Sequence, residues 1–184
     1  MPKFEFPPSE ALYPVPVVLV SCGRAENANI ITIAWCGVVC SKPPQVSISI
    51  RPSRYSHQLI KDTGDFVINI PTEDLLKKCD ICGTVSGREK DKFNMCGFTK
   101  VKASKVSAPM IEECPVNIEC KLREIKKLGA HDMFIGEVVA VHADKPLLDK
   151  DGHIDYKKAR PFVYNQGTYW NMGERIGYYG FSGK

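Results

Sequence analysis

Short apolar runs rich in β-branched residues recur along this chain, and they limit what it can fold into. Residues 15–22, 30–40 and 66–70 form three such runs, each bounded by polar residues, glycine or proline. Runs of this kind predict strands, and the first two are apolar enough to be buried on both faces. None comes near the roughly 20 apolar residues of a membrane-spanning helix. The main expectation is therefore a set of short strands.

Residues 45–51 alternate strictly between apolar and polar side chains. Because successive side chains of a strand point to opposite faces, Val46, Ile48 and Ile50 share one face. The opposite face carries two serines and Arg51, so it is polar and available to a ligand.

Two longer segments predict an antiparallel hairpin. Residues 116–123 alternate in the same way, and the apolar run 133–141 follows across a turn that contains Gly129. Beyond Lys145 the chain is expected to be irregular. Many short strands with a few short helices indicate a mainly β (α+β) fold, arranged as a closed or nearly closed barrel because closure removes exposed sheet edges.

The helices are expected between the strands. Ser53 is placed to cap a short helix, and Gly64 suits its left-handed end. A second helix is expected over residues 72–83, with one apolar stripe formed by Leu75, Leu76, Cys79 and Cys82. Residues 86–93 predict a further helical turn.

Composition fits one domain that spans residues 1–184. The 184 residues, 43% of them hydrophobic, suffice for a core without disulfides or metal. The formal charge of +4 is small and scattered, which argues against a nucleic-acid surface. The first residues lack the order of a signal peptide, and most of the eight cysteines lie in apolar runs. We therefore expect a cytoplasmic protein with reduced thiols and no membrane contact.

Several familiar motifs fail. The chain has no G-x-G-x-x-G, and the glycine-rich residues 177–184 have the wrong spacing for a phosphate loop and no helix after them. Cys79 and Cys82 have the spacing of a zinc or redox pair but lack a second pair, so core packing is the simpler reading. The four histidines show no metal-ligand spacing. No metal site is expected.

A candidate anion site follows the alternating strand. Arg51 ends its polar face, and residues 52–56 (Pro-Ser-Arg-Tyr-Ser) open a helix directly afterwards. Backbone N–H groups, two guanidinium groups and two hydroxyls can all donate to a phosphate there. The alternative is that Ser53 merely caps the helix while both arginines are solvated.

An ordered series of short motifs resembles the flavin-reductase-like, FMN-binding split-barrel family, and within it the flavoredoxins most. The series covers much of residues 13–169, and its pieces lie at residues 27–37, 41–46, 49–51, 55–56, 66–71, 86–93 and 131–138. The resemblance implies a homodimer of split barrels with FMN bound near the subunit interface. It also implies that the isoalloxazine ring is lined by Asn29, Ile31, Thr32, Ala34 and Trp35, and that the ribityl phosphate is held by Arg51, Ser53, Arg54, Tyr55 and Ser56.

Further residues have two open readings. Ser86, Asp91 and Lys92 match a family signature and either touch the flavin or fix the loop over it. By the same resemblance, His131 is the catalytic candidate, which hydrogen-bonds reduced flavin or orients a nicotinamide; otherwise it is a surface turn histidine. Trp35 is either a flavin contact or a core aromatic. The aromatic tail is either a flavin cover or interface packing, and it comprises Tyr164, Tyr169 and Trp170.

The resemblance implies an oxidoreductase that transfers electrons from NAD(P)H through FMN to free flavin, ferric iron or an acceptor protein. Because no separate nicotinamide motif is present, the nicotinamide is expected to stack on the flavin. Two alternatives stay open: an electron carrier reduced by a partner protein, and a flavin binder without a redox role. A cysteine near the flavin, at positions such as Cys22, Cys36 or Cys40, either exchanges electrons or simply fills the core.

Overall fold

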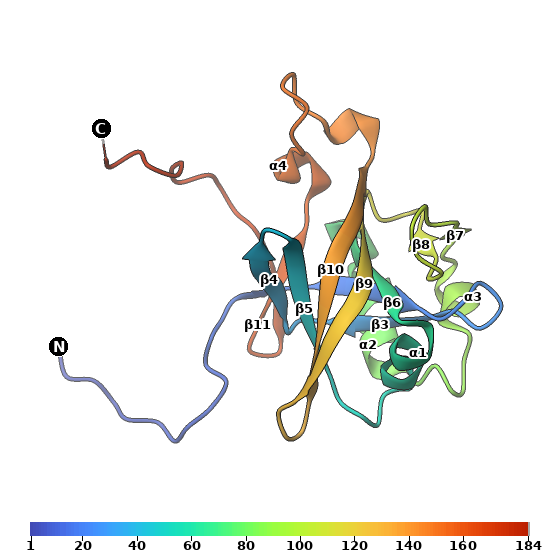
Figure 1. Ribbon diagram of the computed structural model, residues 1–184. Coiled ribbons are helices and arrows are strands. Elements are labelled where there is room, and N and C mark those ends of the chain that lie inside the picture. Colours follow the sequence, from blue (N-terminus) through green and yellow to red (C-terminus); the bar gives the residue numbers. More distant parts are fainter. Residues whose placement is uncertain (184) are drawn as a thin grey trace.

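A seven-stranded sheet lies at the centre of the computed structural model, which describes residues 1–183 (Figure 1). Its strand order is β3-β2-β6-β9-β10-β5-β4. The strands are β2 (Val18–Cys22), β3 (Asn29–Ile33), β4 (Cys36–Ser41), β5 (Pro44–Ile50), β6 (Asp65–Ile70), β9 (Val116–Lys127) and β10 (Asp132–Ala143). Neighbouring strands of this sheet are antiparallel, and β9 with β10 forms the predicted hairpin.

Smaller elements surround this sheet. β1 (Val15–Pro16), β11 (Phe162–Asn165) and β12 (Thr168–Asn171) form a second sheet, and β7 (Lys100–Val101) pairs with β8 (Met110–Ile111). The helices are α1 (Tyr55–Thr63), α2 (Leu76–Thr84), α3 (Lys92–Cys96) and α4 (Tyr156–Ala159), with 3-10 turns at Glu73–Leu75 and Lys145–Leu147. No helix within residues 1–183 is long and apolar enough to cross a membrane.

The large sheet curls until β3 approaches β5, but the two strands are not hydrogen-bonded neighbours. The Ser49 N–H of β5 donates to the carbonyl of Trp35, in the bend after β3, at 2.9 Å. We call this gap the β3/β5 seam. The seam is the split in the barrel. Polar side chains can line it without interrupting the hydrogen bonds between paired strands.

The alternation of residues 45–51 gives the predicted inner face. Val46, Ile48 and Ile50 are buried in the barrel core with Phe66 and Phe134. The opposite face of the sheet at β2 and β3 is covered by α2 and α3, so β2 is buried throughout. The expectation of one buried strand over residues 15–22 is confirmed for β2 only, because Val15–Pro16 forms β1 of the second sheet and Pro16 is exposed.

Four sequence expectations were wrong in detail. Residues 30–40 are two strands because the chain bends at Ala34 and Trp35, and β4 is largely exposed at an edge of the sheet. The second helix is preceded by a 3-10 turn, and Leu76 faces solvent. The helical turn expected over residues 86–93 begins only at Lys92, where Asp91 caps α3, and residues 86–91 form a non-helical loop. The region beyond Lys145 contains α4 and the β11–β12 hairpin, where Phe162 enters the core.

Gly136 on β10 allows the closest packing inside the barrel. A Cβ at this position would lie 2.6 Å from Cζ of the buried Phe66. Gly136→Ala is therefore expected to lower the free energy of unfolding in urea by about 1–3 kcal/mol, through overpacking. Gly37→Ala is the matched control, since nothing lies within 4 Å of a Cβ there. Equal stability of the two variants would contradict this packing.

Candidate functional site

Two adjoining cavities lie along the β3/β5 seam. The larger, about 250 Å³, is called the wide cavity; it is lined by Glu10, Tyr13, Ile31, Thr32, Ile33, Ala34, Trp35, Ser49, Ile50, Arg51, Arg54, Gly83, His131 and Tyr164. The smaller, about 90 Å³, is called the narrow cavity; it is lined by Asn29, Ile31, Ser53, Arg54, Tyr55, Ser56, Gly83, Val85, Ser86, Gly87, Arg88 and Lys92. They share Ile31, Arg54 and Gly83, so one elongated ligand can occupy both.

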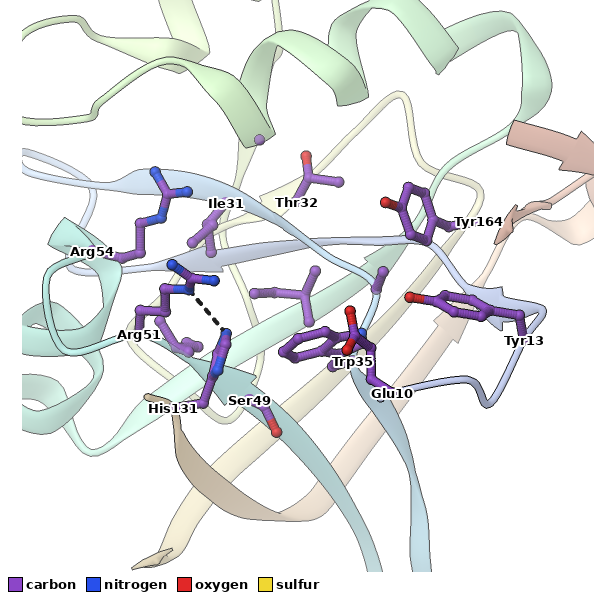
Figure 2. A pocket seen from close by; sticks show the side chains of 14 residues that line it. Glu10, Tyr13, Ile31, Thr32, Trp35, Ser49, Arg51, Arg54, His131 and Tyr164 are labelled. Carbon is purple, nitrogen blue, oxygen red and sulfur yellow. Dashed lines mark hydrogen bonds between the residues drawn. The ribbon is translucent and has the colours of Figure 1, made fainter. Parts of the chain in front are cut away.

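Strand ends and turns place the side chains of the wide cavity. Arg51 directly follows β5, and His131 directly precedes β10, which pairs with β5. Trp35 stands in the bend between β3 and β4. Figure 2 shows Arg51 and Arg54 at one end of the cavity, Tyr13 and Tyr164 at the other, and Trp35 between them.

Trp35, His131 and Arg51 form a contact chain in this cavity. The rings of Trp35 and His131 lie 4.6 Å apart at 60°, and Arg51 Nε donates to His131 Nε2 over 3.4 Å (Figure 2). Burial and the positive charge of Arg51 lower the pKa of His131. The imidazole is therefore held in its neutral form near neutral pH, with Nε2 accepting from Arg51.

The narrow cavity is strongly cationic. Arg54, Arg88 and Lys92 line it, and no carboxylate does. Within residues 1–183 no carboxylate lies within ion-pair distance of any of the three. Arg88 is fixed over the entrance to α1, because its Nη1 donates to the Ser53 carbonyl at 2.7 Å and its guanidinium lies 5.5 Å from the Tyr55 ring.

Lys92 is a buried ammonium group without a counter-charge. It is 4% exposed, and its Nζ donates to the carbonyls of Cys82 at 2.7 Å and Ile30 at 2.9 Å. Burial lowers its pKa, and the charge of Arg54 lowers it further. An ammonium group has three donors, so one N–H is left beyond these two carbonyls. Leaving a charge buried and unpaired is costly, so the narrow cavity favours an anion.

Neutral donors and a close backbone complete the narrow cavity. Asn29 Nδ2 donates to Ser56 Oγ at 2.8 Å, which joins β3 to α1. Gly87 passes so close that a Cβ there would lie 2.2 Å from Asn29 Oδ1. A glycine at this position therefore lets the loop before α3 close over the cavity.

The structure brings together nearly all residues that the resemblance implicates. The wide cavity contains Ile31, Thr32, Ala34, Trp35, Arg51, Arg54 and His131, and the narrow cavity contains Asn29, Ile31, Ser53, Arg54, Tyr55, Ser56, Ser86 and Lys92. Asp91 lies outside both, where its carboxylate accepts from the Asn94 N–H. Arg51 lines the wide cavity rather than the narrow one that suits a phosphate.

The simpler readings of Ser53 as a helix cap and of Trp35 as a core aromatic were wrong, although Arg51 and Arg54 are both exposed, as the capping alternative expected. Ser53 makes no capping bond, because Arg54 is the N-cap residue of α1 and has no side-chain cap. Trp35 is 38% exposed, so it is not an ordinary core aromatic. Tyr164 from the tail lines the wide cavity, whereas Tyr169 packs on Tyr164 and Trp170 is exposed.

Sequence reasoning missed several lining residues. Arg88 and Gly87 lie inside a segment already quoted for the resemblance, so their types were a usable signal. Glu10, Tyr13 and Gly83 gave no such signal, because only the folded chain brings them to the seam.

The cysteines near the site behave as small apolar side chains. Burial raises the pKa of the Cys22, Cys36 and Cys79 thiols to about 12. Thiolate, the form that reacts in redox exchange, is therefore scarce at neutral pH. This favours the core-filling reading at these positions.

The fold and site define a split-barrel protein with an elongated cleft that is cationic at one end. A sequence profile described as "Flavin reductase like domain" matches residues 10–172, and the chain belongs to this family. A protein of Archaeoglobus fulgidus is 34% identical over 167 residues, covering 91% of this chain and 94% of that one.

Two solved structures are similar over their whole length. Flavoredoxin of Desulfovibrio vulgaris has a TM-score of 0.92 and 33% identity, covering 99% of this chain and 100% of that chain. Flavoredoxin from Methanosarcina acetivorans has a TM-score of 0.93 and 30% identity, covering 100% and 98%. The expected split-barrel fold and family are thereby confirmed.

The Arg51–His131 contact makes a titration prediction. Arg51→Gln removes the positive charge that opposes protonation, so the pKa of His131 should rise, as followed by proton NMR of the imidazole ring. Arg123→Gln is the control, because that guanidinium pairs with Glu137 and does not contribute to the pKa of His131. An unchanged pKa in Arg51→Gln would show that the two side chains do not interact.

Proposed function

We propose that the two cavities hold one molecule of FMN, with the phosphate in the narrow cavity and the isoalloxazine ring in the wide cavity. The cationic narrow cavity carries this proposal. A phosphate monoester bears close to two negative charges at neutral pH, and it would neutralise much of the charge of Arg54, Arg88 and Lys92. The N-terminus of α1, which begins at Tyr55, borders the same cavity and favours an anion.

The residues of the wide cavity fit an aromatic ring. Trp35, Tyr13 and Tyr164 supply flat apolar surface, while Thr32 and Ser49 supply short polar groups. Thr32 Oγ1 already donates to the Cys79 carbonyl, which fixes the α2 side of the cavity against β3. The ring would thus lie between the ends of β3 and β5.

The reaction we propose is electron transfer from NAD(P)H through FMN to free flavin, ferric iron or an acceptor protein. Bound FMN supplies the redox chemistry, and the protein supplies orientation and electrostatics. The wide cavity opens to solvent, which leaves room for a nicotinamide to stack. Neutral His131 can hydrogen-bond a ligand in the cavity, and Arg51 can stabilise negative charge there. A cytoplasmic location belongs to the same proposal.

The phosphate assignment has a direct test. Each charge-assisted hydrogen bond contributes about 1.5–3 kcal/mol, so Arg54→Ala with Arg88→Ala should weaken FMN binding by about a hundredfold or more. The measurement is quenching of flavin fluorescence in a titration. Arg24→Ala with Arg123→Ala removes the same charge from positions that line neither cavity, and it should leave the affinity unchanged. Equal affinities in the two double variants would contradict the assignment.

The electron donor is tested separately with the FMN-loaded protein under anaerobic conditions. NADH or NADPH should bleach the flavin absorption to the same end point as dithionite. If dithionite bleaches it and neither nucleotide does, the reductase reading fails and a carrier reduced by another protein takes its place. If the reduced protein passes electrons to no flavin, iron or protein acceptor, a binding role alone is left.

The homodimer also belongs to the proposal, and the chain termini support it. Residues 1–14 and 172–183 contain no helix, and in Figure 1 both arms run past β4 and end away from the barrel, while Glu10 and Tyr13 of the first arm still line the wide cavity. These arms expose Phe4, Phe6, Leu12, Ile176, Tyr179 and Phe181, and the neighbouring edge strand β4 exposes Val38 and Val39. Apolar surface of this extent is typical of an interface between subunits.

Light scattering after size exclusion should therefore give twice the mass of one chain. Val38→Ser with Tyr179→Ser should shift the protein toward the mass of one chain, because apolar contact area is lost. Met95→Ser changes an exposed apolar residue on α3 and should have no such effect. A single-chain mass for the unaltered protein at micromolar concentration would contradict the proposal.

A further inference from the structure

A buried hydrogen bond joins α1 to the first residue of β10. His57 Nε2 and Asp132 Oδ2 lie 2.8 Å apart, and the two residues are 6% and 7% exposed. The His57 ring also packs edge-on against Phe134 at 5.0 Å. Neither residue lines the wide or the narrow cavity, so the bond belongs to the support of the site.

Both partners are adjacent in the chain to cavity residues. His57 follows Ser56 of the narrow cavity, and Asp132 follows His131 of the wide cavity. Helix α1 packs mainly on β2, β3 and β6, whereas β10 is paired with β9 and β5. The His57–Asp132 bond therefore connects elements on the two sides of the β3/β5 seam, where β3 and β5 themselves share little hydrogen bonding.

We infer that His57 and Asp132 are a positioning pair that holds the two walls of the seam in register. The pair keeps Ser56 of the narrow cavity at a fixed distance from His131 of the wide cavity, so that one ligand can meet both residues. The part of this inference that concerns FMN rests on the proposed function. Loss of the pair is expected to loosen the Trp35–His131 contact even without ligand, because His131 directly precedes Asp132 in the chain.

The chain offers a matched pair elsewhere. His142 Nε2 lies 2.6 Å from Oε1 of the buried Glu119, which also accepts from the Ser104 and Lys105 backbone N–H groups. None of these residues lines the wide or the narrow cavity. His142→Ala therefore removes the same kind of bond without touching the seam.

The experiment compares His57→Ala, His57→Gln and His142→Ala in a Trp170→Phe background, where Trp35 is the one remaining tryptophan. Acrylamide quenching of Trp35 fluorescence is measured without ligand, FMN affinity by titration, and melting temperature by circular dichroism. His57→Ala should raise the quenching constant by about twofold. It should also weaken FMN binding by about tenfold, which is the effect expected from the loss of one buried hydrogen bond. His57→Gln can donate from Nε2 to Asp132 and should restore both.

His142→Ala should lower the melting temperature while both Trp35 quenching and FMN affinity stay at the background values. The inference is overturned if folded His57→Ala leaves quenching and affinity unchanged, or if His142→Ala changes them equally. A background protein that binds no FMN would refute the proposed function, whereas increased Trp35 quenching in His57→Ala would still support the positioning pair.

Discussion

The gap between β3 and β5 is the constraint on which the rest of the site depends. If β3 continued alongside β5 as a hydrogen-bonded strand, no room for a ligand would be left between them, but β5 is paired with β10 and β4 instead. Here the strands approach and share the Ser49–Trp35 link, while their ends carry Asn29, Thr32 and Arg51 into the gap. The barrel core formed by Ile48, Phe66 and Phe134 makes this edge rigid, because close-packed interiors resist displacement.

Charge is distributed along the gap in a graded way. One end holds Lys92, Arg54 and Arg88 without a carboxylate, and the other end is aromatic with a single acid, Glu10. The neutral His131 ring and the charged Arg51 side chain lie between these two ends. This order suits a molecule with a doubly charged group at one end and a flat ring at the other, and it disfavours a ligand of uniform polarity.

The sequence could predict what depends on local pattern. Alternation over residues 45–51 predicted the inner face of β5, and Gly64 predicted the left-handed end of α1. The bend at Trp35 could not be read, because an apolar run looks the same whether it is one buried strand or two strands of which one is an exposed edge. Tyr13 and Glu10 reach the seam only through tertiary folding, and the His57–Asp132 pair likewise forms only in the folded chain.

The central claim is that the narrow cavity holds the phosphate of a flavin mononucleotide. Titration of the ligand-free protein with FMN and with riboflavin, which has the same ring but no phosphate, tests this claim most directly. FMN is expected to bind about a hundredfold tighter or more, since at least two charge-assisted bonds depend on the phosphate. Equal affinity for the two flavins would contradict it.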